Sequence, residues 1–186
     1  MDPIASTMDG PDPTRFSAAM TTATTAPPVP FHPPLADITK AIARRSFCML
    51  ATTSPSNRPH VAGVLYVADG TTLHVHTHRT SRKARNVATS GRGFVCIPVR
   101  RLPVGPPSTI QFEATVELLG ADDPSVAALV ESGKAKAITS HGELDDPDGC
   151  FLRITPTGTL LTFGLGMSLR RLMRDPIDAA GRVSLV

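Results

Sequence analysis

The sequence lacks several features that assign chains to common protein classes. It has no tryptophan, one tyrosine and three cysteines, at positions 48, 96 and 150, with no Cys-x-x-Cys pair. A disulfide framework and a structural zinc finger therefore both lack their ligands, and a reducing cytoplasm is the compartment that we expect. The longest apolar run, residues 61–68, is far short of the roughly 20 residues that cross a bilayer. We therefore expect no transmembrane anchor.

The first 34 residues differ in composition from the rest of the chain. They contain eight of the 18 prolines and a Ser/Ala/Thr-rich run at residues 17–26, without a hydrophobic period. Such a segment buries too little apolar surface to offset the entropy lost on ordering. We predict a disordered Pro/Thr/Ala-rich tail at 1–34 and one folded domain at 35–186. The tail has no apolar stretch typical of a signal peptide.

Acidic residues are absent between Asp69 and Glu113, although the chain as a whole carries a net charge of only +3. Basic residues in this window are Arg79, Arg82, Lys83, Arg85, Arg92, Arg100 and Arg101. A stretch of one sign inside a folded domain favours an anionic partner. The alternative is a solvated helix face.

Short runs of alternating apolar residues predict a mainly β (α+β) domain. We expect strands at Phe47–Thr53, Val61–Ala68, Leu73–Thr77, Phe94–Val99, Ile110–Leu119, Cys150–Ile154 and Thr159–Phe163. Helices are expected at 35–46 with Asp37 as N-cap, at 81–89 and at 122–138. Asp69-Gly70 predicts a tight hairpin, and residues 155–158 a second one. This pattern indicates a small closed or half-closed antiparallel barrel.

The sharpest local motif lies where the strand ending near Thr77 leads into a helix. Thr80 or Ser81 caps that helix, and Arg82 and Lys83 follow at once. The N–H groups at a helix start favour an anion, and a hydroxyl, a guanidinium fork and an ammonium group add donors. The motif therefore predicts a site of phosphate size. The simpler interpretation is that Ser81 only caps the helix.

These residues, in this order, resemble a known family. The segment PHVAGVLY at 59–66 precedes the Asp69-Gly70 turn, and His76-Thr77 precedes Ser81-Arg82-Lys83. Over about residues 35–165 the chain is similar to the split-barrel flavin-binding proteins related to pyridoxamine 5′-phosphate oxidase. The resemblance implies an antiparallel FMN-binding split β-barrel, and a homodimer with cofactor sites between the subunits.

The resemblance also implies roles for individual residues. Ser81, Arg82 and Lys83 would hold the cofactor phosphate, and the backbones of His76 and Thr77 would lie along the ring. The remaining cofactor-binding residues would be Val61, Ala62, Gly63 and Val64 on the neighbouring strand and Gln111 on the next long strand. The flavin itself would carry the hydride chemistry, so no catalytic residue is singled out.

The chain departs from the true pyridoxal-phosphate-making oxidases at its C-terminus. The chain has no tryptophan and its last residues, 175–186, read DPIDAAGRVSLV, whereas those enzymes hold substrate with an Arg- and aromatic-rich segment. The expected function is therefore FMN-dependent oxidation or reduction of another, unidentified small molecule. A similar branch binds the deazaflavin F420, whose phosphate and glutamate tail would need further cations. The candidates for these are Arg79, Arg85, Arg44 and Arg45.

Three alternatives of other classes stay open. His74, His76 and His78 alternate along one predicted strand, which suggests a metal or haem site, although a histidine-lined cofactor wall or dimer surface fits the spacing better. A carrier that binds a cofactor without catalysis would keep the same phosphate motif. A nucleic-acid-binding module would use the basic window, but few aromatic residues are present for base stacking. We expect no bound metal.

Overall fold

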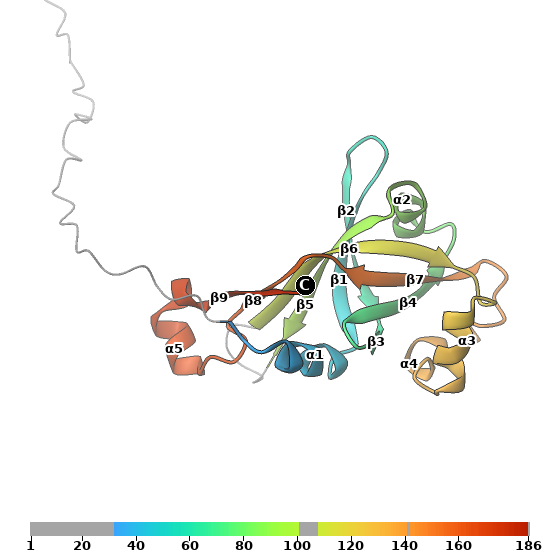
Figure 1. The fold of residues 1–186 in the computed structure, drawn as a ribbon. Helices are drawn as coiled ribbons and strands as arrows, with labels where there is room; N and C mark the ends of the chain where they lie inside the picture. Colours follow the sequence, from blue (N-terminus) through green and yellow to red (C-terminus); the bar gives the residue numbers. More distant parts are fainter. Residues whose placement is uncertain (1–31, 101–107, 141, 186) are drawn as a thin grey trace, which may run out of the picture.

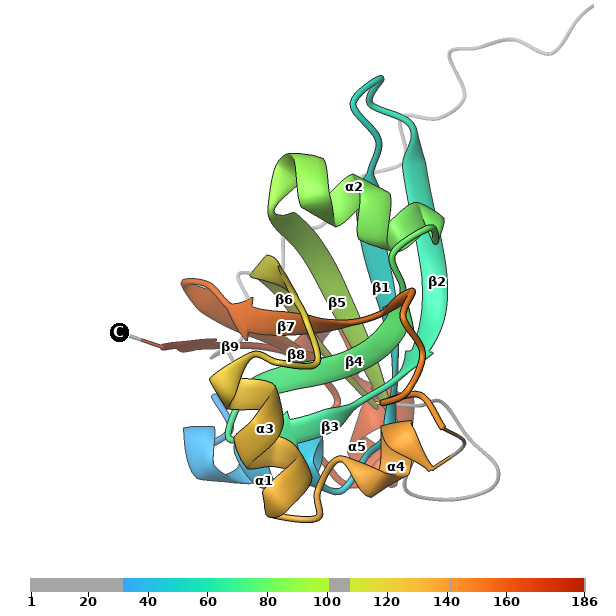
Figure 2. The same ribbon diagram turned by 90° about the vertical axis from the view of Figure 1, so that its right-hand side faces the viewer.

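The computed structural model describes residues 32–100, 108–140 and 142–185, and within them the chain forms one antiparallel sheet. The strands run in the order β2-β1-β5-β6-β7-β4-β3, and β8 and β9 extend the sheet from β6. Their bounds are β1 Phe47–Thr53, β2 Pro59–Leu65, β3 Val67–Asp69, β4 Thr72–His78, β5 Arg92–Val99, β6 Ser108–Leu119, β7 Gly149–Pro156, β8 Thr159–Phe163 and β9 Ala180–Ser184. Although β2 and β4 lie far apart in this order, they contact each other, so the sheet curls into a half-barrel (Figure 2). This is the fold class that the sequence predicts.

Short helices surround the half-barrel. They are α1 Leu35–Ala43, α2 Arg82–Ser90, α3 Pro124–Glu131, α4 Lys136–Thr139, α5 Leu169–Arg174 and a 3₁₀ turn at Pro176–Ala179. In Figure 1, β8, β9 and α5 extend to one side of the barrel, and α3 and α4 lie at the other side. The helix α2 contacts β1, β2 and β6. None of the helices in the described ranges has the length and apolarity of a membrane span.

The main core lies inside the half-barrel, where one face of each strand is apolar. Ile38 and Ile42 of α1 are fully buried against it, together with the inward side chains of β1, β4, β5, β6 and β7. A second, smaller core lies on the outer face of β4 and β7, under α3 and α4. It consists of Val126, Ile138 and Phe151. The strands β4 and β7 are therefore covered on both faces, which explains why their residues are buried without alternation.

The predicted hairpin at residues 155–158 is wrong. Both β7 and β8 pair with β6, at its residues 114–119 and 109–111 respectively, and β8 also pairs with β9. The two strands thus run in the same direction along one edge of β6, and Gly158 (φ 68°) lies between them. The N–H of Thr157 donates to the carbonyl of Glu113 at 2.8 Å and continues the ladder through the bend. A strand of twelve residues is long enough to pair with both.

Several other local predictions are confirmed or corrected. The strand at Phe47–Thr53 and the Asp69-Gly70 hairpin between β3 and β4 are confirmed. The predicted strand at 61–68 is divided at Tyr66, whose buried hydroxyl donates to the carbonyl of Ile42 at 2.8 Å. The predicted helix at 122–138 is divided into α3 and α4, with Gly133 (φ 72°) between them.

The N-terminal predictions have two different outcomes. The helix α1 begins at Leu35 with Pro34 as its N-cap, so Asp37 lies in its first turn and is not the cap. The predicted tail lies, except for residues 32–34, outside the described residues.

Candidate functional site

Ser81 sets the geometry of the turn between β4 and α2. Its backbone is extended (φ −65°, ψ 150°), and its Oγ accepts a hydrogen bond from the N–H of Ala84 at 3.3 Å. The same Oγ lies 3.3 Å from the Oγ1 of Thr77, the buried residue near the end of β4. Ser81 is thus the N-cap that the sequence predicts. The Ser81 cap accepts from one N–H group of the first turn of α2, and the other N–H groups at a helix start are the kind of donor that binds anions.

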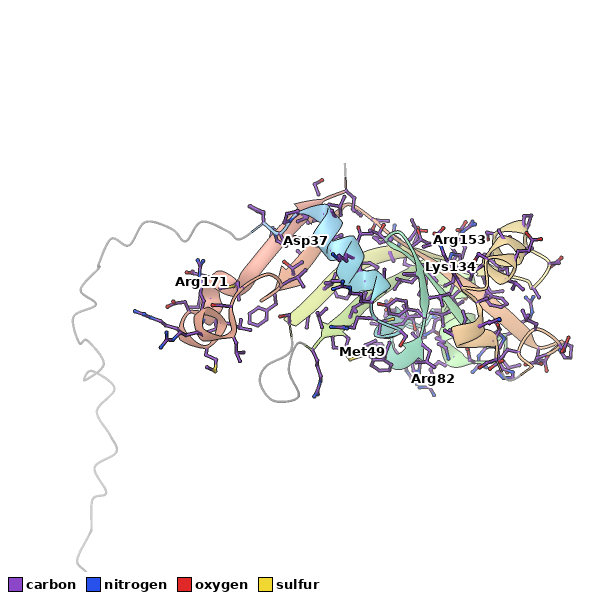
Figure 3. The ribbon with its side chains drawn as sticks, turned by 90° about the horizontal axis from the view of Figure 1, so that it is seen from below. Asp37, Met49, Arg82, Lys134, Arg153 and Arg171 are labelled. Carbon is purple, nitrogen blue, oxygen red and sulfur yellow. The ribbon has the colours of Figure 1, made fainter. Side chains whose placement is uncertain are left out.

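The buried face of α2 fixes the direction in which its basic residues point. Ala84 and Val87 pack into the barrel, and the buried Asn86 donates from Nδ2 to the Oγ1 of Thr52 at 3.0 Å. The opposite face leaves Arg82 and Arg85 exposed. Figure 3 shows Arg82 on the side of the barrel opposite Asp37 of α1.

The cations at the start of α2 are not neutralised by neighbouring carboxylates. The ion pairs between described residues join His78 to Asp146, Lys134 to Asp69 and Arg153 to Glu117. Among the described residues, none involves Arg82, Lys83 or Arg85. These three side chains are therefore available to an anionic ligand.

A cleft of about 440 Å³ opens beside them, between α2 and the turn that joins β1 to β2. Arg58 and His60 line it from the turn and from β2, and Arg82, Arg85 and Asn86 line it from α2. We call it the basic cleft, because its described lining contains no acidic residue. Sequence analysis missed Arg58 and His60, since their local sequence shows only a turn followed by a strand.

The strands that the resemblance assigns to the cofactor ring are brought together. Val61 and Gly63 point outward from β2, with Val61 62% exposed, whereas Ala62 and Val64 point toward the barrel. On β4, Thr77 is buried, and its carbonyl accepts a hydrogen bond from the Sγ of Cys150 at 3.3 Å. The strands β2 and β4 contact each other, and the assignment of these residues to the cofactor stays a prediction.

Gln111, the remaining residue assigned to the cofactor, lies on a different strand, β6. It is opposite Cys96 of β5 and Leu161 of β8, and its amide donates to the Oγ1 of Thr109 at 3.1 Å. It does not line the basic cleft. Its assignment to the cofactor stays a prediction.

The four arginines that the sequence offers as further cations for F420 do not all lie at the basic cleft. Arg85 lines the basic cleft, and Arg79, Arg44 and Arg45 do not. Arg45 donates from Nη2 to the carbonyl of Arg100 at 2.8 Å, and the N–H of Arg79 donates to the carbonyl of Asp148 at 2.9 Å.

The three histidines of β4 have three different environments. His74 is only 4% exposed and lines a second cleft with Lys134 and Arg153, which Figure 3 shows close together beside α3. The ring of His76 packs against that of Phe151, with centroids 5.2 Å apart. Burial lowers the pKa of both imidazoles.

His78, in contrast, is exposed, and its Nδ1 lies 3.3 Å from a carboxylate oxygen of Asp146. The described residues contain no group of three His, Cys, Asp or Glu side chains arranged to hold a metal ion. Sequence analysis did not predict that α3 and α4 pack on the outer face of β4. Nothing in the local sequence of β4 indicates this contact.

Large apolar side chains are exposed on the outer face of β1, β2 and β5. Phe47 and Met49 of β1 lie opposite Leu65 and Gly63 of β2, and Phe94 of β5 lies opposite Ala51. Phe47 is 45% exposed, Met49 37%, Leu65 56% and Phe94 36%. We call this surface, together with Val61, the apolar face.

Comparison with known proteins agrees with this architecture. A family model described as pyridoxamine 5′-phosphate oxidase matches residues 35–163. No curated protein matches the chain. Among solved structures, the heme storage protein HutZ from Vibrio cholerae is 18% identical, with a TM-score of 0.62, and the match covers 70% of this chain and 95% of that one.

Two further solved structures show the same fold. A heme binding protein from Mycobacterium smegmatis is 15% identical, with a TM-score of 0.64, over 83% of this chain and 59% of that one. A FAD-binding protein from Mesorhizobium loti is 16% identical, with a TM-score of 0.54, over 67% of this chain and 89% of that one.

Proposed function

The chain belongs to the pyridoxamine 5′-phosphate oxidase family, and on this basis we propose that it binds FMN and uses it to oxidise or reduce a small molecule. The observation that carries the proposal is the start of α2. Ser81 caps the helix there, and Arg82 and Lys83 follow without a carboxylate partner among the described residues. A helix start with unneutralised cations is a site for a phosphate group.

The residues of this site fit the phosphate end of a flavin cofactor. Two phosphate oxygens would accept the guanidinium fork of Arg82, and Lys83 would add a point charge. N–H groups of the first helical turn that the Ser81 cap does not use would complete the shell. The Oγ of Ser81 accepts from Ala84, and when Thr77 donates to it across 3.3 Å, the proton of Ser81 would be available for donation to the phosphate.

The strands β2 and β4 would then position the ring. The backbones of His76 and Thr77 would lie along one side of it, and residues 61–64 along the other. The buried hydrogen bond from Cys150 to the carbonyl of Thr77 holds the end of β4 in place. When bound, the flavin supplies hydride or electron transfer, and the protein supplies orientation and exclusion of water.

We also propose that the active form is a homodimer with its cofactor sites between the subunits. The apolar face supports this, because a contiguous exposed patch of this kind marks an interaction surface. Val61 and Gly63 belong both to this face and to the strand assigned to the ring. Met49 of β1 pairs with Cys96 of β5, and Cys96 pairs with Gln111 of β6, so the three residues lie side by side on this face. A second subunit packed there would bring its own Gln111 toward the first subunit's cofactor.

The reaction is not the formation of pyridoxal phosphate in this proposal, because the C-terminal residues offer no aromatic clasp for that substrate. F420 is the alternative cofactor, and it would use the same phosphate residues. A carrier of FMN, F420 or haem is the alternative of another class. His74 gives little support to haem, because it is only 4% exposed, and the ring of the partly buried His76 packs against Phe151.

The test is a titration of the purified protein with FMN, F420 and haem, followed by fluorescence or absorbance. The double variant Arg82→Ala/Lys83→Ala should lose two charge-assisted contacts of about 1.5–3 kcal/mol each, which corresponds to a loss of affinity for FMN of at least about 100-fold. The matched control is Arg170→Ala/Arg171→Ala on α5. It removes two adjacent cations far from the site and should bind FMN like the wild type.

Unchanged FMN affinity in the first variant would refute the phosphate assignment. Catalysis is separated from carriage by adding a nicotinamide donor to the FMN-loaded protein. Reduction of the bound flavin faster than that of free FMN supports an oxidoreductase, and an equal or lower rate supports a carrier.

A further inference from the structure

The second cleft lies on the outer face of the sheet, between the strands β3, β4 and β7 and the helix α3. Its volume of about 370 Å³ lies within the range of roughly 300–1,000 Å³ that is usual for clefts that bind small ligands. Its described lining shares no residue with that of the basic cleft, and none with the residues assigned to the cofactor. An inference about the second cleft therefore does not depend on the proposed function.

Strand pairing brings polar side chains together on the floor of this cleft. His74 of β4 lies directly opposite Arg153 of β7, and Thr72 of β4 lies directly opposite Asp69 of β3. Because Thr72 and His74 are two residues apart on one strand, the two pairs are roughly 7 Å apart along β4. All four residues line the cleft. A cationic and an acidic group thus lie within the length of a small molecule.

The imidazole of His74 lacks a partner inside the protein. The side chain is only 4% exposed, and its Nδ1 atom is buried without a hydrogen-bond partner. Buried polar groups of folded proteins are nearly always paired, because an unpaired one costs stability. An unpaired imidazole at the floor of a cleft points to a ligand that brings polar groups of its own.

The two cations of the cleft are held in place and are each paired with one carboxylate. The Nε of Arg153 donates to Glu117 at 2.7 Å, and the Nζ of Lys134 donates to Asp69 at 3.1 Å. A guanidinium has five N–H donors and an ammonium has three, so these bonds orient the groups without using their capacity. Because two carboxylates are close by, the site favours one negative charge over a polyphosphate. Figure 3 shows Arg153 and Lys134 near each other beside α3.

The wall opposite these groups is apolar. Ala128 and Leu129 of α3 line the cleft, and Leu129 is only 6% exposed. A ligand that fits all the walls therefore combines an anionic end, a second polar group and a small apolar part.

We propose that the second cleft binds a small carboxylic acid that carries an α-amino or α-hydroxyl group and a short apolar side chain. Arg153, beside His74, binds the carboxylate. Asp69 and Thr72 bind the amino or hydroxyl group, and the apolar side chain packs on α3.

The experiment titrates the full chain with L-leucine, with its 2-hydroxy analogue and with 3-methylbutylamine, and follows binding by isothermal calorimetry. One of the two acids should bind and the amine, which lacks a carboxylate, should not. Tighter binding of leucine identifies the second group as an ammonium, and tighter binding of the hydroxy acid identifies it as a hydroxyl.

Two variants locate the binding site. Ala128→Phe fills the cleft from the exposed face of α3 and should weaken binding at least about tenfold. The matched control is Ala127→Phe, which makes the same change at the next exposed position of α3, outside the lining of the cleft, and should change affinity less than about twofold. Arg153→Gln should also lose at least about tenfold in affinity for the acid. Since Ala128→Phe removes no ion pair, it tests the site even where Arg153→Gln lowers stability.

The outcomes separate this inference from the proposed function. If neither acid binds, or if Ala128→Phe and Arg153→Gln leave the affinity unchanged, the inference is overturned. It is also overturned if Arg82→Ala/Lys83→Ala abolishes binding of the acid, because the acid then occupies the start of α2. If an acid binds with the expected losses in the two cleft variants but FMN does not bind, the inference stands and the proposed function fails.

Discussion

Replacement of Asn86 with alanine should destabilise the protein by removing the buried link between α2 and β1. Asn86 and Thr52 are each 4% exposed, and the Nδ2 of Asn86 donates to the Oγ1 of Thr52 at 3.0 Å. The substitution leaves the Thr52 hydroxyl buried without this partner, which costs about 1–3 kcal/mol. Alanine recovers about 0.5 kcal/mol through its higher helix propensity. The net loss should therefore be about 0.5–2.5 kcal/mol.

The assay is thermal and urea unfolding followed by circular dichroism. For a chain of this length, a loss of that size lowers the melting temperature by about 1–10 °C. The matched controls are Thr52→Val, which removes the hydroxyl while keeping the shape of the side chain, and the double variant Asn86→Ala/Thr52→Val. In the double variant no hydroxyl is left unpaired, so its destabilisation should be smaller than the sum of the single effects by about 1 kcal/mol.

Strictly additive effects, or a change in melting temperature below about 1 °C for Asn86→Ala, would refute this account of how α2 is anchored. Because Asn86 also lines the basic cleft, the prediction is read from stability alone. Cofactor affinity is tested separately, by substitution of exposed basic residues.

Three further predictions concern the apolar face and the buried titratable groups. Leu65→Asp should convert a dimer into a monomer in analytical ultracentrifugation, and a wild type that is already monomeric would contradict the proposed assembly. Burial raises the pKa of the Cys48 thiol from 9.0 to about 12. The unfolded thiol thus ionises first, and the free energy of unfolding should fall as the pH rises above 9, by at most about 1.4 kcal/mol per pH unit. Cys48→Ala should reduce this slope in urea titrations, and equal slopes would disprove the assignment. Burial lowers the pKa of His74 below its ordinary 6.5, so stability should fall as the pH drops below that value, because the unfolded imidazole binds its proton first. His74→Leu should be less sensitive to acid than the wild type, and identical acid profiles would count against the burial argument.

Local features of this protein can be predicted from neighbouring residues alone. The strand Phe47–Thr53, the Asp69-Gly70 turn and the Ser81 cap each depend on residues a few positions apart. The basic start of α2 follows from the same kind of information, since Arg82 and Lys83 come directly after the cap. For such elements the conformational preferences of the chain and its final contacts agree.

Other features of the fold depend on interactions between segments that are distant in the sequence. Gly158 is a good turn residue, yet the chain bends there without forming a hairpin, because β6 is long enough to pair with β7 and β8 in succession. The helices α3 and α4 cover His74, and the apolar content of β4 does not reveal that cover.

The basic cleft depends on tertiary structure in the same way. Arg58 and Arg85 lie on a turn and a helix that meet only after β1 has paired with β2 and α2 has packed on β1. Sequence alone thus predicted the half-barrel class, from the order of its strands and turns, and the capped, basic start of α2, from adjacent residues. The basic cleft, the cover over His74 and the apolar face arise from pairing over long separations, which no local pattern encodes.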